Sequence, residues 1–327
     1  MDAVATEIRQ ISLEASNLIV KQPAISSAIT LHPVQSQLPA PTDSQIYPHL
    51  PVEVCERIID AIGAEHIYEY GLNNTKTLLA CCLTSREWFH RASRYLYTEV
   101  ALYVHKISSF VEVLVKRPEV GKFVKTLQVW QHEGQPHMDL CLLRKCFPQN
   151  MPNLTRLEFY DVDFGVVSGN FSTHLPNFVT VTSILYGEAK FNTLHELYTQ
   201  LSAFPHLVDL VLSHPRFHSL DAGKPLSTRL TRRCTHKLRI PTAYLDLYNS
   251  NDVHIFELFS PTSITTLTLW FRDDIDGTTV PALASFLHSA QDTLRYFQLH
   301  VHSNIHSDLQ IGELFVSFFI FINDHSC

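Results

Sequence analysis

The sequence has little charge and no long apolar run. Asp, Glu, Lys and Arg make up 17% of its 327 residues, and the net charge is -7. A protein with this balance lacks the positive field that attracts nucleic acid or an anionic membrane, so we expect neither as a partner. The longest apolar run, LFVSFFIFI at 314–322, is far shorter than the ~20 residues of a membrane helix. The first twenty residues lack the apolar core of a secretory signal. We therefore expect an intracellular protein of the cytoplasm or nucleus.

Sequence motifs of catalysis are also missing. The chain has no GxGxxG, GxxxxGK[ST], HExxH or GxSxG. RDDIDG at 272–277 is similar to part of a calcium loop, but Arg272 and Leu283 occupy its first and twelfth ligand positions. The seven cysteines form no CxxC pair, which favours buried thiols in a reducing compartment. His300, His302 and His306 have no cysteine or carboxylate pair at ligand spacing. We expect no enzyme, no cofactor and no bound metal.

The N-terminal third of the chain divides into a linker and a helical segment. Residues 1–45 are expected to be flexible, because 21–44 are rich in Pro, Ser, Gln and Thr. LPVEVCERIIDAI at 50–62 places apolar residues at steps of four, which predicts a helix that ends at Gly63. Further helices are predicted over 78–83 and 88–96, after a polar loop from Glu65 to Lys76. About fifty residues make only a marginal core, which favours a module that packs on another protein over a cap on the next domain.

Beyond residue 100 one short pattern recurs: an apolar residue, two others, an apolar residue, one other and an apolar residue. It occurs in VKTLQV, LTRLEF, VTSILY, LVDLVL, ITTLTL and LRYFQL, with the central residues Leu127, Leu157, Ile184, Leu210, Leu267 and Phe297. HKLRI at 236–240, centred on Leu238, falls near the middle of the widest gap. Spacing in the high twenties predicts a leucine-rich solenoid, and a generic α/β fold is the alternative.

Three features of this repeat region bear on function. Residues that recognise another molecule are expected either at alternate strand positions such as Glu158, Asp209 and Thr268 or on the repeat loops. The basic run 224–239 is either a solvated insertion or a contact for an acidic partner. The tail 310–327 lacks the repeat spacing, and our hypothesis is that it is a truncated or misread end.

The helical segment resembles an F-box motif, in the form found in F-box-like proteins of mushroom-forming fungi. Leu50, Pro51, Val54 and Ile58 are similar to its opening helix; Leu79, Cys82 and Leu83 to its middle helix; and Trp88 to its signature tryptophan. The resemblance covers residues 50–100. It implies an α+β protein, with a three-helix F-box at 46–100 and an irregular α/β leucine-rich-repeat-like domain at 101–327.

The resemblance also implies a function. An F-box packs on the Skp adaptor of a Skp–cullin–F-box ubiquitin ligase, while the repeats hold a protein substrate. The eight residues that carry the resemblance would then form or support the adaptor-facing surface, and Trp88 fits either role. The alternative function is a leucine-rich-repeat interaction scaffold with no ligase role.

Overall fold

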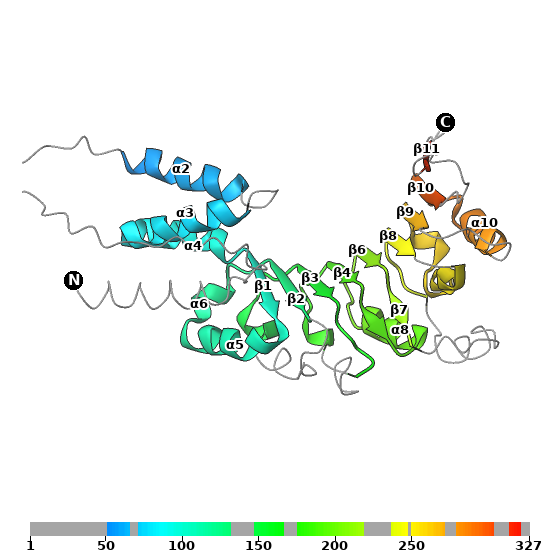
Figure 1. Ribbon diagram of the computed structural model, residues 1–327, viewed down its shortest axis with the longest axis horizontal. Helices are drawn as coiled ribbons and strands as arrows, with labels where there is room; N and C mark the ends of the chain where they lie inside the picture. Colours follow the sequence, from blue (N-terminus) through cyan, green and yellow to red (C-terminus); the bar gives the residue numbers. More distant parts are fainter. Residues whose placement is uncertain are drawn as a thin grey trace, which may run out of the picture. The chain divides into compact units, whose positions relative to one another are not determined.

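A computed structural model of the chain is shown in Figure 1, and the contacts divide it into two units, Met1–Leu96 and Tyr97–Cys327. The expected domain boundary was residue 100. The structure describes residues 51–65, 71–131, 147–166, 175–218, 237–247, 250–271, 279–303 and 314–321. The predictions for 1–45, Leu50, and most of 224–239 and 310–327 therefore lie outside the described residues. Within the described ranges, no helix has the length and apolarity needed to span a bilayer.

The first unit contains three helices, α2 (Val52–Glu65), α3 (Gly71–Thr84) and α4 (Arg86–Leu96). Pro51 precedes α2, and its carbonyl accepts the first N–H groups of the helix, from Val54 and Cys55. Ser85 begins α4, because its side-chain oxygen accepts the Trp88 N–H at 3.2 Å. The helices enclose a small core of Ile59, Leu78, Cys81, Cys82 and Ala92, with Ile62, Trp88, Phe89, Tyr95 and Leu96 packed partly buried against it.

Two local predictions for this unit were wrong. Gly63 does not end α2, which continues to Glu65. It is buried against α4, where a Cβ atom would lie 2.2 Å from the ring of Tyr95. The predicted loop from Glu65 to Lys76 is helical from Gly71 onward. The physical reason is Thr75, which is buried one turn before Leu78 and so extends the inward face of α3.

The second unit is built on a nine-stranded sheet of order β1-β2-β3-β4-β6-β8-β9-β10-β11. The first eight strands are parallel, and β11 pairs antiparallel with β10. The strand bounds are Glu99–Tyr103 for β1, Thr126–Trp130 for β2, Arg156–Tyr160 for β3, Ser183–Gly187 for β4, Asp209–Ser213 for β6, Thr242–Leu247 for β8, Thr266–Phe271 for β9, Tyr296–Ser303 for β10 and Leu314–Phe321 for β11. The chain is thus a mixed α/β protein, with packed helices followed by a largely parallel sheet.

The strand register confirms the predicted central residues, with one correction. Leu127, Leu157, Ile184 and Leu210 pair in a single row, and the same row ends in Leu267 and Phe297. The member between Leu210 and Leu267 is Ala243 rather than Leu238. Leu238 forms only an isolated bridge with Phe259. The segment IPTAYL at 240–245 has the repeat spacing, but its small central alanine concealed it.

The helical elements of this unit lie on one side of the sheet (Figure 1). They are η1 (Val104–Lys106), α5 (Ile107–Lys116), α6 (Pro118–Gly121), η2 (Leu175–Asn177), α8 (Leu194–Ser202), η3 (Ser250–Leu258), η4 (Pro261–Ser263) and α10 (Thr279–Ala290). Burial alternates along the strands: in β9, Leu267, Leu269 and Phe271 are buried, while Thr266, Thr268 and Trp270 are partly exposed. We call the second set of positions, on every parallel strand, the open face.

Three consecutive strands leave the sheet by the same turn. The residue after β3, β4 and β6 has a positive φ near 50–56° in each case: Asp161, Glu188 and His214. The chain then enters a second, short parallel sheet of β5 (Lys190–Phe191) and β7 (Arg216–Phe217), which Asp163 joins by a bridge to Lys190. Equivalent phenylalanines, Phe164, Phe191 and Phe217, follow the three turns and stack in sequence.

Candidate functional site

Helix α2 carries two adjacent apolar stripes, and the three-helix unit buries only one of them. Ile59 and Ile62 pack in the core, and Cys55, one turn before Ile59, is also buried. Val54 and Ile58, four residues apart, are 40% and 46% exposed. The core of this unit therefore leaves these side chains uncovered, which is unfavourable for large apolar groups in water.

Helix α3 repeats this arrangement. Leu78 and Cys82 face the core, whereas Leu83 is 48% exposed and Leu79 is partly exposed. The Cys82 Sγ lies 3.8 Å from Ser93 Oγ, and burial raises the pKa of its thiol to about 11. Cys82 is thus a neutral thiol of the interior at physiological pH, and we expect it to be unreactive.

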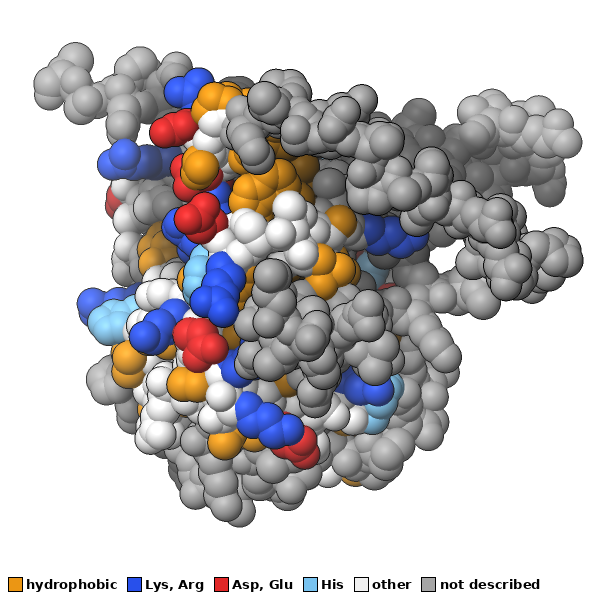
Figure 2. Space-filling model, turned by 90° about the vertical axis from the view of Figure 1, so that its left-hand side faces the viewer, with side chains coloured by type: hydrophobic (Ala, Val, Ile, Leu, Met, Phe, Trp, Pro, Cys, Tyr) orange, Lys and Arg blue, Asp and Glu red, His pale blue; other side chains and the backbone are white. Residues whose placement is uncertain are grey.

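The eight residues that carry the F-box resemblance have different environments. Pro51, Val54, Ile58 and Leu83 are exposed, and Leu79 is partly exposed. Trp88 is partly buried and packs against the core, and Cys82 is buried, so these two support the helices. Leu50 lies outside the described residues. We call Val54, Ile58, Leu79 and Leu83 the outer stripes; Figure 2 shows how hydrophobic side chains reach the surface between acidic and basic ones on one face of the molecule.

A polar clamp fixes α4 against α2. The Arg91 guanidinium donates to both Asp60 oxygens, at 2.8 and 2.6 Å, and pairs with Glu56 at 2.7 Å. The Tyr95 hydroxyl also donates to Asp60 at 2.9 Å. The hydrogen bond from Arg91 is the main cause that lowers the pKa of Asp60. Arg91 and Asp60 are 31 positions apart, so the sequence alone gives no sign of this pairing.

Removal of this carboxylate should make the unit less stable in a pH-dependent way. Since the folded pKa of Asp60 is below its unfolded value, its contribution is present above about pH 4 and is lost as the pH falls through the folded pKa. We expect Asp60→Asn to lose less than about 1 kcal/mol at pH 7, because the side chain is more than a third exposed. Urea titrations at pH 7 and at pH 3 measure this difference. A destabilisation of equal size at both values would contradict it.

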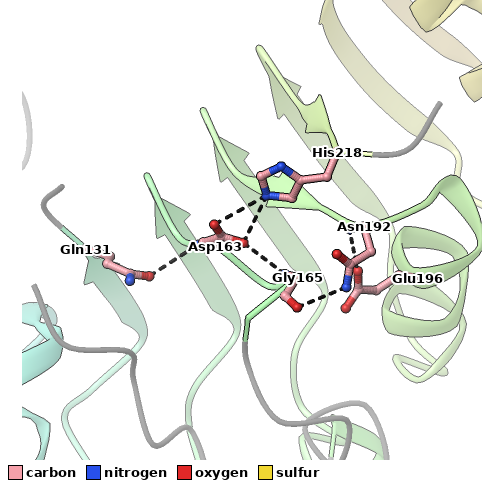
Figure 3. Close-up of polar contacts among 6 residues, drawn as sticks. All are labelled: Gln131, Asp163, Gly165, Asn192, Glu196 and His218. Atoms are coloured by element: carbon pink, nitrogen blue, oxygen red, sulfur yellow. Dashed lines mark hydrogen bonds and ion pairs between the residues drawn. The ribbon is translucent and has the colours of Figure 1, made fainter. Parts of the chain in front are cut away.

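A second cluster of polar side chains lies where the strands of the large sheet end (Figure 3). The Asp163 carboxylate accepts the Gly165 N–H at 3.0 Å and lies 3.4 Å from His218 Nε2, while the Gln131 side chain accepts the Asp163 N–H at 3.1 Å. Asn192 donates to the Gly165 carbonyl at 3.0 Å. These bonds join the loops that follow successive strands, so they hold the loops in place. In the described part of the chain, no three His, Cys, Asp or Glu side chains gather in a way that fits a metal ion.

Ser213, His214 and Asp246 meet near the same strand ends, but their arrangement is not that of a hydrolase. His214 Nε2 lies 3.1 Å from Asp246, and the Ser213 hydroxyl donates to the same carboxylate oxygen at 3.4 Å. An activated serine instead donates to its base, and the base is oriented by the acid. The residue types of a triad are present here without the hydrogen bond from nucleophile to base.

The open face holds the residues that the sequence suggested for substrate recognition. Asp209 and Thr268 are partly exposed there, whereas Glu158 is buried. Glu158 accepts hydrogen bonds from Arg156 and from the Tyr160 hydroxyl, so its charge is already partnered. The sequence interpretation named acidic positions on this face but missed the aromatic side chains beside them.

Comparison with models of known protein families finds no match to this sequence. A comparison with curated proteins finds no similar sequence either.

Proposed function

We propose that the chain is the substrate-recruiting subunit of a Skp–cullin–F-box type ubiquitin ligase. Its three-helix unit is the F-box and binds the Skp adaptor, and the sheet unit is a degenerate leucine-rich-repeat domain that binds a protein substrate. The chain performs no bond chemistry itself. It raises the effective concentration of substrate lysines near the charged ubiquitin-conjugating enzyme.

The observation that carries the adaptor role is the pair of outer stripes. The large side chains Val54, Ile58 and Leu83 are each at least 40% exposed on a unit whose own core is small. Apolar residues at helical spacing that a small unit leaves uncovered are typical of a face that another protein covers. Their positions are those at which the F-box resemblance expects adaptor contacts.

The repeat assignment of the sheet unit is supported by its regularity. Central apolar residues of neighbouring strands stand directly opposite one another from β2 to β6. Equivalent turns with positive φ follow β3, β4 and β6, and equivalent phenylalanines stack behind them. Each repeat of strand and turn therefore buries its apolar side against the next repeat, as in a solenoid.

The adaptor role predicts that a charge in the outer stripe of α2 abolishes binding. We expect Ile58→Lys in the full chain to weaken the affinity for purified Skp adaptor by about tenfold or more, because a desolvated contact is replaced by a buried charge. Biolayer interferometry measures this, and circular dichroism checks the fold. Val115→Lys is the matched control: Val115 is 67% exposed on α5 of the other unit, so its replacement should leave binding unchanged.

The outcomes separate the two functions. If the wild-type chain does not bind the adaptor, the ligase role is wrong and the non-ligase interaction scaffold becomes the better assignment. If Ile58→Lys and Val115→Lys bind equally well, the adaptor does not contact the outer stripe of α2. Replacement of Leu50 and Pro51 together by alanine then tests the entry to the helix.

A further inference from the structure

The open face carries an excess of negative charge. In the three rows that all eight parallel strands share, four residues are acidic, Glu99, Glu158, Asp209 and Asp246, against one basic residue, Arg156. Asp246 is paired with His214, and Arg156 is paired with Glu158. Glu99 and Asp209 form no ion pair with the residues that the structure describes.

At the opposite end of β1 from Glu99, the open face is aromatic. Tyr103, Trp130 and Tyr160 stand opposite one another in the last row of β1, β2 and β3. The rings of Trp130 and Tyr160 are stacked, with centroids 4.0 Å apart and planes at 11°. The next member of the row is Gly187, where a Cβ atom would lie 2.7 Å from the Tyr160 ring. The glycine thus makes room for the ring, and the stack is built into the sheet.

No basic side chain that the structure describes is in direct contact with the Glu99 carboxylate. It is exposed at the first position of β1, and it makes no hydrogen bond or ion pair with any residue that the structure describes. Desolvation is the main cause that raises the pKa of its carboxyl; the negative charge of Glu158 raises this pKa further, and the positive charge of Arg156 lowers it. A cation next to Glu99 would relieve this repulsion.

We propose that the open face of β1, β2 and β3 binds a basic peptide segment, in which one arginine or lysine side chain pairs with Glu99 and another lies against Trp130 and Tyr160. Such a side chain has an apolar stem that packs on aromatic rings and a charged end that the carboxylate attracts. Charge complementarity with this acidic and aromatic surface therefore favours a basic peptide as the ligand. The inference rests on the proposed function only for the fate of the bound protein, which would be a ubiquitination substrate.

The experiment uses the full chain and a fluorescein-labelled peptide of alternating glycine and arginine, followed by fluorescence anisotropy at physiological salt. The comparison peptide has citrulline, the neutral isostere, in place of each arginine. We expect the citrulline peptide to bind about tenfold more weakly. Glu99→Gln should weaken the arginine peptide by about three- to fivefold, the range of a partly exposed ion pair. Trp130→Leu should weaken both peptides.

Glu112→Gln is the matched control, since Glu112 is 71% exposed on α5 and its replacement changes the net charge equally. An equal effect of Glu99→Gln and Glu112→Gln would overturn the proposal in favour of unspecific attraction to an acidic protein. Equal binding of the two peptides, or no binding of either, would also overturn it.

Two other occupants give distinct results. If the wild-type chain binds no arginine peptide but a chain with Arg229, Arg232 and Arg233 changed to Gln does, the chain's own basic run occupies this surface. If Glu99→Gln converts a dimer to a monomer in sedimentation, a second copy occupies it. Either result would contradict the proposal that a separate protein binds this surface. Adaptor binding depends on α2 and is measured separately, so a failure of one proposal is distinguishable from a failure of the other.

Discussion

Phe191→Ala is expected to destabilise the sheet unit by about 3–5 kcal/mol, the range for truncation of a fully buried aromatic residue. Phe191 has no exposed surface. Its ring stacks on Phe164 at 5.2 Å and on Phe217 at 5.9 Å, and it meets Tyr186 edge-on at 5.3 Å. The substitution therefore opens a cavity between consecutive strand-and-turn repeats. The stacking of these repeats is what stabilises the sheet unit.

Phe217→Ala provides the control for this prediction, because Phe217 occupies the equivalent place in the next turn but is partly exposed. We expect it to lose less than half as much free energy of unfolding. Urea denaturation followed by near-ultraviolet circular dichroism measures both variants. An equal or greater loss for Phe217→Ala would mean that the stacked phenylalanines do not act as an internal column centred on Phe191.

Much of the sheet could be predicted from the sequence, because a strand that is buried on one face leaves a short periodic signal. The run around Leu157 and the run around Leu210 have this signal, and both residues are found in one row of the sheet. The signal failed where a strand has a small central residue, as at Ala243. It also failed at β1, where YTEVAL has the same spacing around Val100 but follows the helical segment directly.

The candidate sites were less accessible to sequence reasoning. Hydrophobic spacing along α2 marks a broad apolar face, but it does not divide that face between core and surface. The division depends on where α4 lies, and the clamp of Arg91 on Asp60 that holds α4 joins residues far apart in the chain. In the same way, the stack of Trp130 on Tyr160 arises only when β2 and β3 pair in register. Contacts between segments, rather than patterns within them, create both surfaces.

Gly63→Ala should unfold the three-helix unit, although alanine is the better helix former. In an open helix the change would stabilise by up to about 1 kcal/mol. Here the new methyl group would lie 2.2–2.6 Å from three atoms of the Tyr95 ring. The ring cannot move away freely, because its hydroxyl is bonded to Asp60 and the side chain packs against the core. We expect a net loss of about 1–3 kcal/mol, which a core of this size does not tolerate well.

Hydrogen–deuterium exchange measures this prediction for each unit separately. Residues 51–96 should exchange rapidly in Gly63→Ala, while the strands of the sheet unit stay protected, and adaptor binding should be lost without any change to the outer stripes. The control is the same substitution in a Tyr95→Leu variant. Without the ring, Gly63→Ala should leave the stability unchanged or increase it, so the effects of the two substitutions should be strongly non-additive. If Gly63→Ala destabilises both backgrounds equally, the close approach of α2 to α4 at Tyr95 is not what requires a glycine at this position.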